Sequence, residues 1–123
     1  MKIAILVREE TMMNCTGSGC MNAFFKKIDS FARYADQEDV ELVAFTHNGG
    51  DLEKKILALK KKEVDVVHLS SCIRGKDINY ESMAKRLSEE FDVVGYTHGQ
   101  EIGKTRQAII QEKNSKPLIT DGN

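Results

Sequence analysis

Short runs of apolar, mostly β-branched residues recur along this chain and predict buried parallel strands. Such strands are covered on both faces of a sheet, so they show continuous hydrophobic runs rather than alternation. Three runs are clear and the fourth is weaker, and they cover Ile3–Val7, Val40–Phe45, Val64–Leu69 and Val93–Tyr96. The pattern therefore predicts four short strands with little exposed surface.

Between these runs, apolar residues recur at spacings of three and four, which is typical of amphipathic helices. The three clearest stripes are Met21, Phe24, Phe25, Ile28, Phe31, Ala32 and Ala35, then Leu52, Ile56, Leu57 and Leu59, and then Tyr80, Met83, Ala84, Leu87 and Phe91. A final helix is expected from about Glu101 to Lys113, with Ile102, Ile109 and Ile110 on one face. Strands and helices thus alternate along the chain.

This alternation predicts a three-layer α/β domain, flavodoxin-like or Rossmann-like, with a four- or five-stranded, mainly parallel sheet. Right-handed crossovers place helices on both faces of such a sheet, and the simplest strand order is 2-1-3-4. The chain has 123 residues, the usual size of one domain, so residues 1–123 are expected to form a single unit. The segment 114–123 is either a frayed tail or, at Pro117–Ile119, a fifth edge strand.

Composition narrows the classes of partner. Lys and Arg number 18 and Asp and Glu number 19, which gives a formal net charge of −1. A nearly balanced charge offers no general attraction to nucleic acid or to an anionic membrane, so neither is an expected partner. The first apolar run ends at Arg8 and is too short for a signal-peptide core or a membrane span, so a cytoplasmic protein is expected.

All three cysteines and two of the three histidines follow the predicted end of a strand. Cys15 and Cys20 come after the first strand, His47 after the second, Cys72 after the third and His98 after the fourth. An open parallel sheet binds its ligands beyond the carboxyl ends of its strands, so these side chains are expected to share one site. Because an odd number of cysteines cannot form a closed disulfide framework, metal binding or thiol chemistry is the expected role.

The loop Cys15–Cys20, with the sequence CTGSGC, is the strongest local motif. Gly17, Ser18 and Gly19 make it a tight polar turn whose backbone amides are candidates to bind a small anion or cofactor. Cys20 is expected in the first turn of a helix, where the helix dipole favours the thiolate needed by a metal ligand or a nucleophile. The alternative is that both cysteines are small buried apolar side chains.

The same loop resembles the phosphate-binding loop of low-molecular-weight tyrosine phosphatases. Those enzymes carry an arginine six residues after the cysteine, and Met21 stands at that position here. Without a guanidinium to stabilise the transferred phosphoryl group, phosphoryl transfer is not expected. Weak binding of an anion by the loop amides stays open.

Other polar residues near the strand ends have structural alternatives. His68 lies inside the third predicted strand and is expected to be a buried, hydrogen-bonded, neutral imidazole. Asp51 is expected to cap the following helix, with metal ligation as its alternative role.

His47 and His98 follow strands that are three strand spacings apart in the predicted sheet, about 14 Å, so they can share one ion only if their loops lean inward. The expected ligand set is therefore the three cysteines with one histidine or solvent.

Five landmarks occur in order along the chain, and they are Met1–Ile3, Cys15–Cys20, Phe45–Thr46, His68–Cys72 and Gly95–His98. In this order they resemble the CGGC-domain family of small bacterial and archaeal proteins, and the resemblance covers about residues 1 to 99. The resemblance implies metal binding, with zinc as the expected ion, through the abundant cysteines and histidines of the family. It implies no particular reaction.

The chain departs from this family at the motif that names it. Asn48 and Asp51 replace the two cysteines of the Cys-Gly-Gly-Cys motif, while Gly49 and Gly50 remain and His47 precedes them. The loss of two soft ligands leaves two alternatives. Either His47 and Asp51 act as harder ligands, which weakens the preference for thiophilic metals, or the metal site has decayed and only the scaffold remains.

Three functions stay open on this basis. The leading hypothesis is a cytoplasmic protein that binds one zinc or iron ion with the three cysteines and either His47 or His98. The second is a thiol redox or thiol-transfer protein in which Cys20 attacks and another cysteine resolves the intermediate. The third is a module that binds a small anion or nucleotide at the glycine loop, without catalysis.

Overall fold

The centre of the molecule is a five-stranded sheet in the order β2-β1-β3-β4-β5, in a computed structural model that describes residues 1–114. The strands are β1 (Lys2–Val7), β2 (Glu41–His47), β3 (Val66–Leu69), β4 (Asp92–Val94) and β5 (Ile110–Gln111). The first four are parallel to one another, and β5 runs antiparallel to β4. The predicted mainly parallel α/β fold and the order of its first four strands are confirmed.

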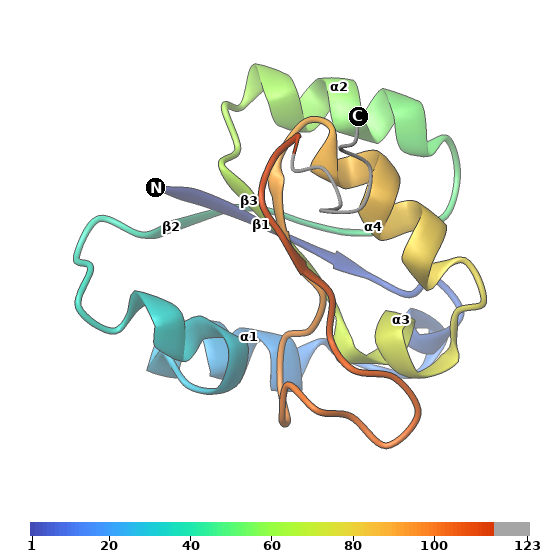
Figure 1. Cartoon of the computed structure of the whole chain (residues 1–123), viewed down its shortest axis with the longest axis horizontal. Coiled ribbons are helices and arrows are strands. Elements are labelled where there is room, and N and C mark those ends of the chain that lie inside the picture. The colour runs from blue at the N-terminus through green and yellow to red at the C-terminus, as the bar shows by residue number, and fades with distance from the viewer. Residues whose placement is uncertain (115–123) are drawn as a thin grey trace, which may run out of the picture.

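Helices cover both faces of this sheet. They are α1 (Ser18–Lys26), α2 (Leu52–Lys61), α3 (Ser71–Lys76) and α4 (Tyr80–Ser88), with 3₁₀ turns η1 (Thr11–Met13) and η2 (Asp29–Tyr34). Figure 1 shows α2 and α4 on one side of the sheet and α1 with the following turn on the other. Alternate residues of β1 enter different cores, because Leu6 packs with Ile56 and Leu87 whereas Ile5 packs with Phe24 and Phe31.

The first predicted helical stripe does not form one continuous helix. Lys27 ends α1 in a left-handed conformation with φ of 53°, and Ile28 is extended. The chain then forms η2, in which Ser30 donates its backbone N–H to the carbonyl of Thr97 at 3.3 Å. This break turns Phe31 into the core, where its side chain is fully buried.

The helix predicted from Glu101 to Lys113 is wrong, because this segment is extended. A bridge joins Ile102 to Gln107, and β5 pairs with β4 along the sheet edge. The guanidinium of Arg74 donates to the carbonyls of Gln100 and Glu101 at 2.8 and 3.0 Å. In a helix these carbonyls would instead accept hydrogen bonds from backbone N–H groups of the same helix. The candidate strand Pro117–Ile119 lies outside the described residues.

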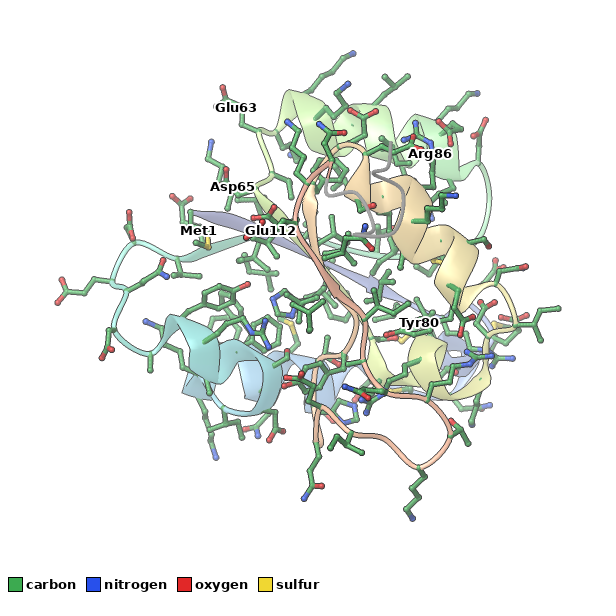
Figure 2. The ribbon with its side chains drawn as sticks, in the orientation of Figure 1. Met1, Glu63, Asp65, Tyr80, Arg86 and Glu112 are labelled. Atoms are coloured by element: carbon green, nitrogen blue, oxygen red, sulfur yellow. The ribbon has the colours of Figure 1, made fainter. Side chains whose placement is uncertain are left out.

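Tyr80 ties the start of α4 to this C-terminal segment (Figure 2). Its buried hydroxyl donates to the carbonyl of Gly95 at 2.7 Å and accepts the backbone N–H of Ile109 at 2.9 Å. The hydroxyl therefore joins the end of β4 to the residues that lead into β5. Burial is the main cause of the raised pKa of this phenol, so it stays protonated and able to donate.

Replacing Tyr80→Phe is expected to lower the free energy of unfolding by about 2 kcal/mol, because two buried backbone groups lose a hydrogen-bond partner. Urea unfolding followed by circular dichroism measures the change. Tyr96→Phe is the matched control, since the Tyr96 ring is buried but its hydroxyl makes no hydrogen bond to any residue of the range 1–114. Equal effects of the two substitutions would contradict the role given to the Tyr80 hydroxyl.

Candidate functional site

A pocket of about 320 Å³ lies beyond the carboxyl ends of β1, β3 and β4. Its lining residues are Val7, Thr11, Met12, Cys15, Gly17, Gly19, Cys20, Ser71, Cys72 and His98. The fold thus brings all three cysteines and one of the candidate histidines to a single cavity, which we call the thiol pocket. Two residues of the glycine loop, Gly17 and Gly19, line it as well.

Cys20 lies in the first turn of α1 and is the buried thiol of the pocket. Its Sγ lies 3.1 Å from the Thr97 hydroxyl oxygen. Burial raises the pKa of Cys20, the hydrogen bond with Thr97 acts in the opposite direction, and repulsion from the Cys72 and Cys15 sulfurs raises the pKa further. Contrary to the expected thiolate in the first turn of α1, burial is the largest effect and keeps the pKa of Cys20 above its ordinary value.

Cys72 is held by the start of α3. Ser70 caps this helix by accepting the backbone N–H of Ile73 at 3.3 Å, and its hydroxyl oxygen lies 2.7 Å from Cys72 Sγ. Ser71, which lies between Ser70 and Cys72, donates its hydroxyl to the carbonyl of His98 at 2.6 Å and accepts the His98 N–H at 3.2 Å. The same turn therefore positions the Cys72 sulfur and fixes the backbone of His98 beside it.

Cys15 and His98 have exposed side chains at the rim of the thiol pocket. The Cys15 sulfur accepts the backbone N–H of Gly17 at 3.3 Å. The His98 ring lies against Gly19, where an added Cβ would approach the ring carbon Cδ2 to 3.2 Å. Because both side chains are exposed, rotation toward the pocket requires no unpacking of the core.

His47 is not among the residues that line the thiol pocket. Its Nδ1 accepts the backbone N–H of Gly49 at 3.0 Å, and its carbonyl accepts a hydrogen bond from Lys55. Asp51 caps α2 by accepting the backbone N–H of Lys54 at 3.2 Å, so its predicted capping role is confirmed.

Asn48, at the first cysteine position of the family motif, has a structural role here. Its Oδ1 accepts the backbone N–H of Glu9 at 3.0 Å, and its Nδ2 donates to Asp77 at 2.9 Å. The amide thus joins the loop after β1 to the end of α3, and neither Asn48 nor Asp51 lines the thiol pocket.

His68 is a buried neutral imidazole, as predicted from its place within a strand. Burial lowers its pKa to about 3, against a smaller opposite effect of a hydrogen bond with the Tyr96 carbonyl. Its Nδ1 lies 3.0 Å from the Ser30 hydroxyl and its Nε2 lies 2.8 Å from the Tyr34 hydroxyl. The ring also stacks on Phe31, with 4.1 Å between ring centroids. Both nitrogens are therefore engaged within the core.

The donor types around the thiol pocket suit a soft or borderline metal, since thiolates and imidazole bind zinc and iron. Within residues 1–114, however, no group of three or more Cys, His, Asp or Glu side chains is arranged to hold a metal ion.

Among residues 1–114 no helix is both long and apolar enough to cross a membrane.

Sequence reasoning missed the hydroxyl groups that position the cysteines. Thr97 contacts Cys20, Ser70 contacts Cys72, and Ser71 holds the backbone of His98. In the sequence Thr97 directly precedes His98 and Ser71 directly precedes Cys72, and this proximity to candidate ligands could have pointed to them. Thr11 and Met12 line the pocket from a short 3₁₀ turn, which leaves no periodic pattern in the sequence.

Comparison with known proteins agrees with the landmarks along the chain. Residues 2–98 match the model of the CGGC domain. The uncharacterized protein MJ0582 of Methanocaldococcus jannaschii is 31% identical over 107 residues, which cover 76% of this chain and 81% of that protein. No solved structure matches the chain. The protein belongs to the CGGC-domain family.

Proposed function

We propose that this protein binds one thiophilic metal ion, zinc or iron, in the thiol pocket. The observation that carries the proposal is the convergence of three cysteine thiols, from segments more than fifty residues apart, on a single cavity of about 320 Å³. Membership of the CGGC-domain family favours the same function, because the family's cysteines and histidines suggest metal binding. The proposal assigns no reaction.

The electrostatics of the three thiols support a cation in this pocket. Repulsion from Cys72 and Cys15 contributes to the raised pKa of Cys20, so these two sulfurs lie close enough to disfavour a negative charge on Cys20. A divalent cation reverses this balance, because coordination deprotonates a thiol outright. Metal binding is therefore expected to release protons and to depend steeply on pH.

The proposed ligands are Cys15, Cys20, Cys72 and His98. Cys20 and Cys72 are held by neighbouring hydroxyls, whereas the side chains of Cys15 and His98 are exposed at the rim of the pocket. Binding would thus complete the site by rotating two surface side chains onto two fixed sulfurs. We leave His47 out of the set, because it does not line the thiol pocket.

Titration of the reduced, metal-free protein with Cd²⁺ tests the proposal, because cadmium–thiolate bonds absorb in the ultraviolet. We expect one ion per chain, and Zn²⁺ competition then gives the zinc affinity. Loss of a residue that only hydrogen-bonds to a metal ligand already weakens metal affinity by about 10- to 100-fold. Cys72→Ser removes a ligand itself, so it is expected to weaken the affinity by about 100-fold. His98→Ala should weaken binding as well.

His47→Ala is the matched control and is expected to bind the ion as tightly as the unmodified protein. Negligible binding by the unmodified protein, or equal affinities for the protein and Cys72→Ser, would reject the proposal. A redox protein would instead lose a pair of free thiols on mild peroxide treatment without metal. That alternative has less support, since burial raises the pKa of Cys20, the residue expected to attack.

A further inference from the structure

A second hollow of about 320 Å³ adjoins the thiol pocket. Its lining residues are Arg8, Glu10, Thr11, Asn14, Cys15 and Lys76. Thr11 and Cys15 line both cavities, so the Cys15 side chain lies at the boundary between them. We call this second hollow the basic compartment. Nothing in the proposed metal set uses its charged residues.

The basic compartment carries one net positive charge, from two cations and one carboxylate. Arg8 donates to the Thr11 hydroxyl at 3.3 Å and lies 3.9 Å from a carboxylate oxygen of Glu10, whose side chain is 69% exposed. Such an exposed ion pair contributes little and is readily exchanged. Lys76 is exposed, and its ammonium has no hydrogen bond or ion pair with any residue in the part of the chain that the structure describes.

We propose that the basic compartment is an anion subsite of the thiol pocket and takes the carboxylate of a small ligand whose other end reaches the cysteine sulfurs. The amide of Asn14 and the hydroxyl of Thr11 add neutral hydrogen-bonding groups to the same lining. One net positive charge matches a single carboxylate, and Glu10 disfavours a group with two negative charges. A small mercapto acid has this chemistry, since one end is soft and the other anionic.

This inference rests on the proposed function only for the soft end of the ligand, whose sulfur would bind the metal ion. The anionic end depends on Arg8 and Lys76, so it can be tested in metal-free protein. Failure of the Cd²⁺ titration and failure of the following experiment are therefore separate results.

Alkylation of Cys15 by iodoacetate and by iodoacetamide provides the test. In each reaction the Cys15 thiolate attacks the methylene carbon, a carbon–sulfur bond forms and iodide leaves. The reagents are close in size and differ in charge, and the new carboxylate lies two bonds from the sulfur. Because both attack the same thiolate, the fraction of ionised Cys15 cancels from the ratio of their rates. Peptide mass spectrometry measures that ratio at each cysteine.

We expect the iodoacetate-to-iodoacetamide ratio at Cys15 to be about fivefold higher than in Lys76→Gln, because one nearby cation stabilises the approaching carboxylate. Glu10→Gln should raise the ratio, and added salt should lower it. Lys61→Gln is the matched control, because Lys61 is exposed on α2 and lines neither cavity. Of the two cavities, Cys72 lines the thiol pocket and not the basic compartment, so it is the internal comparison.

Equal ratios at Cys15 in the unmodified protein and in Lys76→Gln would overturn the inference. So would an equal fall of the ratio in Lys61→Gln, because that result would assign the preference to net charge rather than to the compartment. A high ratio in a protein that binds no Cd²⁺ would retain the anion subsite and reject the metal ion.

Discussion

Acidification from pH 7 to pH 3 is expected to lower the free energy of unfolding by about 4 kcal/mol through His68 alone. In the folded protein, burial holds the pKa of this imidazole at about 3, compared with an ordinary value of 6.5. Between these pH values the unfolded chain binds a proton at His68 and the folded protein does not. The contribution is therefore fully present above pH 6.5 and is lost as the pH falls toward 3.

The surroundings of His68 explain why the proton is excluded. Ser30, Tyr34 and Phe31 enclose the ring, and its side chain is fully buried. No carboxylate of residues 1–114 contacts it, and the charge of Arg33 lowers its pKa further. Burial likewise raises the pKa of Tyr34, so that hydroxyl stays neutral and supplies no compensating negative charge.

Urea unfolding at a series of pH values measures the effect, and His68→Gln isolates it. Glutamine keeps an amide that can hydrogen-bond to the same hydroxyls but does not titrate. The variant is expected to be less stable at pH 7 and to lose less stability on acidification. Parallel pH profiles for the two proteins would contradict the assignment. If the variant fails to fold, NMR titration of the His68 ring gives the same answer, because the ring should remain neutral at pH 5.

The parts of the fold that the sequence predicts are those with dense apolar patterns. The first strand is flanked on both faces by helices, so Ile3, Ile5 and Leu6 belong to the continuous apolar run that is typical of a buried parallel strand. The C-terminal segment is different. Its spacing of Ile102, Ile109 and Ile110 fits a helix, yet its backbone is held by hydrogen bonds donated by Arg74 and accepted by the Tyr80 hydroxyl. Those are long-range contacts, which periodicity within one segment does not report.

The same distinction applies to the candidate site. Cysteines at the ends of parallel strands predict a shared pocket because strand order alone brings them to one edge of the sheet. The ionisation of Cys20 could not be predicted in that way. It depends on how much solvent the folded protein excludes from the sulfur and on the distance to Thr97, a residue 77 positions away. The basic compartment beside Cys15 was also hidden, because Arg8 and Lys76 are far apart in sequence and neither belongs to a motif.

Replacing Gly95→Ala is expected to lower the free energy of unfolding by about 3 kcal/mol, the effect of overfilling a tightly packed core. Gly95 lies just past β4, where a Cβ would collide with the Tyr80 hydroxyl and come within 2.8 Å of the Ile109 carbonyl oxygen. One of these atoms belongs to the backbone, so it cannot move aside without disturbing the pairing of β4 with β5. The new methyl group would also separate Tyr80 from the Gly95 carbonyl to which it donates.

Gly75→Ala is the matched control for this substitution. Gly75 lies within α3, and a Cβ there would meet no atom within 4 Å. Alanine is the better helix former by about 0.5 to 1 kcal/mol, so this variant should be at least as stable as the unmodified protein in urea unfolding. A loss for Gly95→Ala no larger than the change for Gly75→Ala would mean that the C-terminal segment yields to the methyl group. In that case the contact between Tyr80, Gly95 and Ile109 does not fix the end of β4, and the position of His98 three residues later depends on the hydrogen bonds that Ser71 and Ser30 make to residues 97 and 98.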